Sequence, residues 1–233
     1  MQDEVEKALK RLHWQGGRIQ AAGRTDTGVH ATGQVIAFDL DWRHPVDELH
    51  QALNAQLPMD IVAREVRAVN HQFDPRRHAA SRHYRYCIFC DAVRHPLRER
   101  YAWRVWPALE VELLQQAADA LTGTHDFRAF GTPPRAGGST ERTVSQAAWR
   151  QTGSDLVFDV AADAFLYHMV RRLVVLQVTL AQRKINLPAL LEYLDPAPGS
   201  AVYVQGLAPA QGLCLVRVEY PPEKLVLENI GSV

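Results

Sequence analysis

Residues 23–30 read Gly-Arg-Thr-Asp-Thr-Gly-Val-His, and this octapeptide is the most informative stretch of the 233-residue chain. Two glycines bracket the carboxylate of Asp26 between strand-like segments, so we expect a tight loop where backbone can approach a ligand closely. Such a carboxylate can act as a nucleophile or as a general base. The same residues also allow a plain hydrogen-bonded turn formed by Thr25 and Asp26.

The Asp-Thr-Gly tripeptide at residues 26–28 is also typical of aspartic proteases, which pair two such carboxylates. In those proteases apolar strand residues normally precede the aspartate. Here Gly-Arg-Thr precedes Asp26 and a histidine follows at position 30. An aspartic protease is therefore the weaker interpretation of this loop.

Strands and helices are predicted on both sides of the octapeptide. Apolar alternation predicts strands at 34–42, 61–69, 81–90, 141–151, 155–162 and 214–220. Helical spacing predicts helices at 2–13, 46–57, 110–121, 165–180 and 188–194, and the prolines and glycines of 131–140 predict a mobile loop.

The order of these elements predicts an α+β fold. We expect two similar α/β-sandwich-like domains with mainly antiparallel sheets and a central basic cleft between them. The first domain is placed at 1–105 and contains Asp26, and the second, at 106–233, completes the cleft.

The composition is that of a globular chain, with 47% hydrophobic and 22% charged residues. No stretch approaches the roughly 18 apolar residues of a membrane span, and no basic-then-apolar leader opens the chain, so we expect a cytoplasmic protein. Cys87 and Cys90 lie in a predicted strand, where positions three apart point to opposite faces. With Cys214 as the third and last cysteine, neither a disulfide framework nor a metal site is predicted.

The formal net charge is zero, yet the basic residues are unevenly distributed. Between positions 64 and 104 there are ten arginines but only four acidic residues. The whole chain has 22 arginines and only 4 lysines. The planar guanidinium engages phosphate through two hydrogen bonds, which favours a nucleic-acid partner. A solvated basic face in a GC-rich genome explains the same composition, so charge alone leaves both interpretations open.

Together with its continuation to Val35, the octapeptide resembles the catalytic motif of bacterial tRNA pseudouridine synthases that act on positions 38, 39 and 40. Thr27 replaces the usual alanine. Further motifs resembling the family's occur in the family's order at 82–86, 123–127 with Phe130, 142–144, 165–171 and 208–213. The resemblance covers essentially the whole chain.

The resemblance implies an isomerase that converts uridine to pseudouridine at positions 38, 39 or 40 of the tRNA anticodon stem-loop. It also implies a cytoplasmic homodimer that holds one tRNA across both subunits, with no metal or organic cofactor. Such enzymes take the target base out of the stack. The choice of uridine would then depend on the shape of the RNA stem and on which uridines can reach the active site.

Site residues follow from the same resemblance. Asp26 is assigned as the nucleophile that starts cleavage of the glycosidic bond, Arg171 as its ion-pair partner and Tyr84 as the ring that stacks on the target base. Arg24 and Arg82 are assigned to substrate binding. Pattern alone leaves Arg171 free to pair with another acid and allows Tyr84 to be a core residue. Phe127 and Gln34 receive no definite role. His168 is assigned no chemistry, since a histidine in a helix is more often a packing residue than a catalytic one.

The chain departs from the family pattern in two further places. The family's opening strand and turn do not precede the helix at Gln2, so we expect the first domain to lack one strand. A late-assigned start or a truncated gene explains this, and a catalytically impaired tRNA-binding fragment is therefore the second candidate function. Arg172 stands where the family usually has asparagine.

Overall fold

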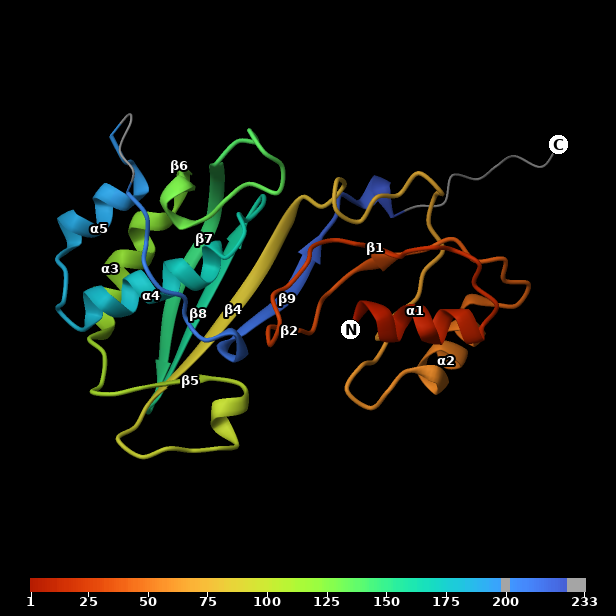
Figure 1. The fold of residues 1–233 in the computed structure, drawn as a ribbon, viewed down its shortest axis with the longest axis horizontal. Helices are drawn as coiled ribbons and strands as arrows, with labels where there is room; N and C mark the ends of the chain where they lie inside the picture. The colour runs from red at the N-terminus through yellow and green to blue at the C-terminus, as the bar shows by residue number, and fades with distance from the viewer. Residues whose placement is uncertain (198–201, 226–233) are drawn as a thin grey trace. The chain divides into compact units, whose positions relative to one another are not determined.

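A computed structural model of the chain describes residues 1–197 and 202–225 (Figure 1). It divides into two compact units. The smaller contains residues 1–23, 35–79 and the segment from 220, and the larger contains 24–34 and 80–219. Both units are discontinuous in sequence, whereas the predicted boundary after residue 105 separates two continuous halves. That boundary stays a prediction.

The larger unit is built on a seven-stranded sheet (Figure 1). Its strands, in spatial order, are β2 (His30–Ala31), β9 (Leu213–Glu219), β4 (Ser81–Cys90), β8 (Asp155–Ala162), β7 (Glu141–Thr152) and β6 (Gly123–Asp126), with β5 (Trp103–Val105) also paired to β4. The β2–β9 and β4–β5 pairs are parallel and the others are antiparallel. The predicted α+β class with mainly antiparallel pairing is confirmed.

Alternation along the strands separates the two faces of this sheet. Tyr86, Ile88 and Phe158 point to one face and are fully buried. The helices α3 (Val111–Leu121), α4 (Met169–Ala181) and α5 (Leu187–Leu194) contribute to the same core. Trp149 of β7 donates a 2.8 Å hydrogen bond to the buried Gln177 of α4, so this face is the one that α4 covers.

The opposite face of the sheet carries charged side chains. Arg85 of β4 is paired in register with Asp159 of β8, and Arg150 of β7 reaches the same carboxylate. We call this the open face, because both arginines are about half exposed. Strands β7 and β8 form a hairpin with a two-residue turn. The first residue of this turn is Gly153, which has a positive φ of +58°.

The smaller unit contains α1 (Gln2–Arg11), α2 (Val46–Gln56) and a two-stranded antiparallel sheet of β1 (Gln20–Ala21) and β3 (Ile36–Ala37). Its core lies between the helices and consists of Val5, Ala8, Leu9, Trp14, Ile19 and Leu53. The predicted alternation of residues 34–42 places Ile36, Phe38 and Leu40 against this core. Only Ile36 and Ala37 pair as a strand, because the partner strand β1 is two residues long.

The strand predicted at 61–69 is wrong. Side chains of α2 satisfy the backbone of Ala63 instead of a ladder partner. Asn54 accepts from the Ala63 N–H at 2.8 Å and donates to its carbonyl at 2.9 Å, and the His50 ring contacts that carbonyl at 2.7 Å. Because both backbone polar groups of Ala63 are already paired, this residue cannot join a strand ladder.

The other predicted helices and strands agree with the observed elements except at the start of α4. That helix begins at Met169 and not at residue 165, because His168 adopts a left-handed conformation with φ of +66°. The short elements β2, β5 and β6 were not predicted, and residues 131–140 form a loop with a single bridge at Thr132. No helix among the described residues is long and apolar enough to cross a membrane.

Candidate active site

Residues 24–29, which carry Asp26, belong to the larger unit and lead into β2. The N–H of Val29 donates to the carbonyl of Asp26 at 3.1 Å and closes the turn. Gly28 has φ of +85°, a conformation that favours glycine, and a Cβ there would lie 3.3 Å from that of Ala210. Thr27 is exposed, so its replacement of the family's alanine introduces no packing conflict.

Arg171, on the first turns of α4, reaches this loop across 145 positions of sequence. Its Nη1 donates to Asp26 Oδ2 at 2.7 Å, and its Nε donates to the carbonyl of Ala208 at 2.7 Å. The two charged side chains are only 14% and 17% exposed. In a pair so shielded from water, the two opposite charges compensate each other, and the second hydrogen bond fixes the direction of the guanidinium.

His168 contacts the same carboxylate, although sequence reasoning assigned it no role. Its Nε2 lies 3.3 Å from Asp26 Oδ2. Burial lowers the pKa of His168, the charge of Asp26 opposes that shift, and Arg172 and Arg171 reinforce it. Burial thus favours the neutral imidazole, which lies in contact with the carboxylate of Asp26. The sequence did contain a signal for this contact, because His168 lies three residues before Arg171 and residues with this spacing on a helix share a face.

Both contacts to Asp26 involve the same oxygen, Oδ2. Within residues 1–197 and 202–225, no side chain or backbone group donates a hydrogen bond to Oδ1. The carboxylate is thus held from one side and keeps one oxygen available to a substrate. With 17% of its side chain exposed, Asp26 is largely shielded from solvent.

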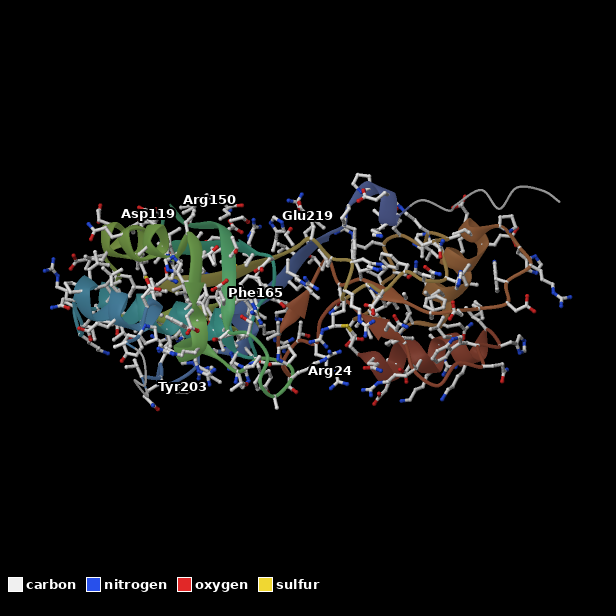
Figure 2. All side chains as sticks on the ribbon, turned by 90° about the horizontal axis from the view of Figure 1, so that it is seen from above. Arg24, Asp119, Arg150, Phe165, Tyr203 and Glu219 are labelled. Carbon is white, nitrogen blue, oxygen red and sulfur yellow. The ribbon has the colours of Figure 1, made fainter. Side chains whose placement is uncertain are left out.

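Tyr84 of β4 is half-buried near this carboxylate. Its ring packs edge-on against Phe165, with centroids 5.1 Å apart; Figure 2 labels Phe165 in the middle of the larger unit. Burial raises the pKa of Tyr84 to about 12, the charges of Asp26 and Cys214 add to the shift, and Arg82 opposes it. Tyr84 is therefore a neutral phenol at physiological pH, close enough to sense the charge of Asp26.

Tyr86 lies on the same face of β4 but is fully buried, and its hydroxyl donates to the carbonyl of Pro209 at 2.8 Å. Arg82 donates to the carbonyl of Asp163 at 2.7 Å, so part of its guanidinium is held by protein. Arg24 is exposed and forms no hydrogen bond or ion pair within the described part of the chain (labelled in Figure 2). Among the described residues, the Arg24 guanidinium, two positions before Asp26, thus has no protein partner.

The arginine-rich segment 64–104 is more neutralised than its composition indicates. At least six of its ten arginines form ion pairs with carboxylates, namely Arg67, Arg77, Arg85, Arg94, Arg98 and Arg104. Their partners include Asp155 and Asp159, which lie outside the segment. A local excess of arginine in sequence is thus partly balanced by acids from β8.

Comparison with known sequences identifies the class of protein that this fold and site represent. A sequence model described as tRNA pseudouridine synthase matches residues 1–76 and 117–221. The chain therefore belongs to the tRNA pseudouridine synthase family and is an isomerase, as the octapeptide predicted.

Individual relatives are similar over almost the whole chain. The chain is 44% identical over 226 residues to tRNA pseudouridine synthase A of Moorella thermoacetica, a match that covers 94% of this chain and 89% of that protein. Proteins of the same name from Geobacter sulfurreducens and Geotalea daltonii are 39% and 36% identical over 220 residues, with the same coverage of both chains. The aspartic-protease interpretation of residues 26–28 has no support in these matches.

Proposed function

We propose that this protein converts uridine to pseudouridine at positions 38, 39 and 40 of the tRNA anticodon stem-loop. Family membership and relatives named tRNA pseudouridine synthase A support the reaction. The observation that carries the proposal is the geometry of Asp26, whose Oδ2 is bound by Arg171 at 2.7 Å while Oδ1 has no protein partner among the described residues. A fixed, ionised carboxylate with one available oxygen is what nucleophilic catalysis requires.

The reaction breaks the bond between ribose C1′ and uracil N1 and forms one between C1′ and C5. In the proposed sequence Asp26 Oδ1 attacks C1′ and expels uracil, which turns in the pocket and attacks C1′ through C5, releasing the carboxylate. The hydrogen on C5 is then lost to water and N1 takes a proton. Atoms balance without oxidation or net hydrolysis, and the C5 hydrogen provides an assay.

The neighbouring side chains have distinct tasks in this proposal. Arg171 holds Asp26 through Oδ2 and so directs Oδ1 towards the substrate, because the second hydrogen bond, to the carbonyl of Ala208, fixes the position of the guanidinium. The Tyr84 ring stacks on the flipped uracil, and a neutral phenol avoids adding negative charge beside Asp26. The exposed Arg24 is suited to a backbone phosphate.

The finer assignments of partner and compartment rest on the family resemblance. We infer a cytoplasmic homodimer that binds one anticodon stem-loop across both subunits, with Arg82 also contacting RNA. Light scattering of the purified chain, with and without tRNA, should report the mass of two protomers. A single protomer at micromolar concentration would rule out the dimer.

Tritium release from tRNA labelled at uracil C5 tests the function directly. The wild-type chain should release tritium, and Asp26→Ala and the isosteric Asp26→Asn should not, although both should still bind tRNA. Asp39→Asn removes an exposed carboxylate of the smaller unit and serves as the matched control. A folded wild type that binds tRNA without releasing tritium would instead support the alternative, a catalytically impaired binding fragment.

A further inference from the structure

Tyr167 is an exposed tyrosine whose ring contacts His168, a side chain that lies beside Asp26. It is 59% exposed, yet its ring packs on that of His168 with centroids 3.7 Å apart and an interplanar angle of 31°. His168 in turn lies 3.3 Å from Asp26 Oδ2. One imidazole ring therefore lies between an exposed phenol ring and the candidate nucleophile.

The backbone of Tyr167 is held on both sides. Its N–H donates to the carbonyl of Thr132 at 3.0 Å, and its carbonyl accepts from Arg172 Nη1 at 3.4 Å. A Cβ at Gly131 would lie 2.4 Å from the Tyr167 oxygen, so this close approach requires glycine. The ring is thus exposed from a fixed backbone position.

Arg172, the residue that departs from the family pattern, is itself well anchored. It is 8% exposed, donates to the carbonyl of Phe130 at 3.0 Å and lies 4.3 Å from the centroid of the Tyr203 ring, which Figure 2 labels. A buried guanidinium that bonds two carbonyls connects Phe130 with Tyr167 across the loop. The substitution from asparagine therefore adds support beneath Tyr167.

We propose that Tyr167 is the stacking platform for the nucleobase next to the target uridine. This inference rests on the proposed function and extends its site from one nucleotide to two. An aromatic ring that is pre-ordered and exposed loses little conformational freedom when a base stacks on it. When the target uridine leaves the stack, the adjacent nucleobase loses a stacking partner. The Tyr167 ring replaces that partner, since only the His168 ring separates it from Asp26.

Substitutions at Tyr167 combined with abasic substrates test the proposal. Stacking on an aromatic side chain contributes roughly 1–3 kcal/mol per base, so Tyr167→Leu should raise KM for tRNA about 5- to 100-fold, while Tyr167→Phe stays close to wild type. The leucine preserves much of the packing on His168. Trp106→Leu, at another exposed aromatic residue of the same unit, is the matched control and should leave KM unchanged.

The substrate half of the experiment uses tRNA with an abasic site on the 5′ or the 3′ side of the target. With one of these substrates, the difference between wild type and Tyr167→Leu should disappear, because the stacking partner is gone. An unchanged KM for Tyr167→Leu on intact tRNA, or a defect that persists on both abasic substrates, would overturn the proposal; persistence would mean that Tyr167 acts through His168. Absence of tritium release by the wild type would refute the proposed function itself, a separate result.

Discussion

Two carboxylates of the larger unit, Asp26 and Asp159, have similar surroundings and different bonding. Both are shielded, with 17% and 13% of the side chain exposed, and each contacts two nitrogen-bearing side chains. At Asp159 the donors are divided, since Arg85 Nε binds Oδ1 at 2.8 Å and Arg150 binds Oδ2. At Asp26 both neighbours meet at Oδ2.

The difference separates a structural ion pair from a reactive one. A carboxylate with both oxygens occupied joins strands β4, β7 and β8 across the open face but has no oxygen left for a substrate. Arg150, labelled in Figure 2, belongs to this group. Charge and burial alone would rank the two aspartates together, whereas the distribution of hydrogen bonds over their oxygens distinguishes them.

The largest effect is expected from exchanging each aspartate for asparagine. Asp26→Asn should lower single-turnover pseudouridine formation by at least about 10³-fold, because the amide is not a nucleophile. Asp159→Asn should leave the rate within about 2-fold and lower the free energy of unfolding by about 1 kcal/mol, since both arginine partners are half exposed. Comparable rates for the two variants would remove the distinction.

A smaller effect is expected at the arginine partners. Arg171→Lys should slow the chemical step by about 10- to 100-fold, because an ammonium does not reproduce both the bond to Asp26 and the bond to Ala208. Arg85→Lys on the open face is the matched control and should keep the wild-type rate. The measurement is tritium release under single-turnover conditions, and equal rates for both lysine variants would contradict a directing role for Arg171.

Replacing the ring of Tyr84 should have an effect of similar or lesser size. Tyr84→Leu should weaken turnover by about 5- to 50-fold if the ring stacks on uracil, whereas Tyr84→Phe should stay within about 3-fold. Because burial raises the pKa of Tyr84 to about 12, its proton should not influence the pH–rate profile between pH 6 and 9, a range well below that value. A phenylalanine variant as slow as the leucine variant would show that the hydroxyl matters.

The smallest effect concerns the dependence of stability on pH. The folded pKa of His168 is lowered, so unfolded chains bind its proton more readily, and stability should be lost as pH falls below the unfolded value of about 6.5. His168→Gln should therefore lose less stability than wild type between pH 7.5 and 5.5 in urea titrations. His44→Gln, at an exposed histidine, is the control and should follow wild type. Parallel curves for His168→Gln and wild type would contradict burial of a neutral imidazole.

Local sequence predicted most helices and the long strands because each has a strong, continuous apolar pattern. The prediction failed at 61–69, where Asn54 and His50 contact the backbone of Ala63. It also failed at 165–168, because His168 is left-handed and Tyr167 bonds to Thr132, so that α4 begins only at Met169. In both places the deciding contact comes from another element. Periodicity contains no information about such contacts.

For the site, the sequence by itself determined the residue types: a carboxylate between two glycines, an arginine on an apolar helix and an aromatic residue on a long strand, in an order that identified the family. Only the tertiary structure decided that His168 joins Arg171 at one oxygen of Asp26, that Arg172 supports Tyr167, and that Asp159 is saturated. The physical reason is that these contacts connect segments up to 145 positions apart. Their geometry depends on strand register and helix packing, which short-range propensity does not specify.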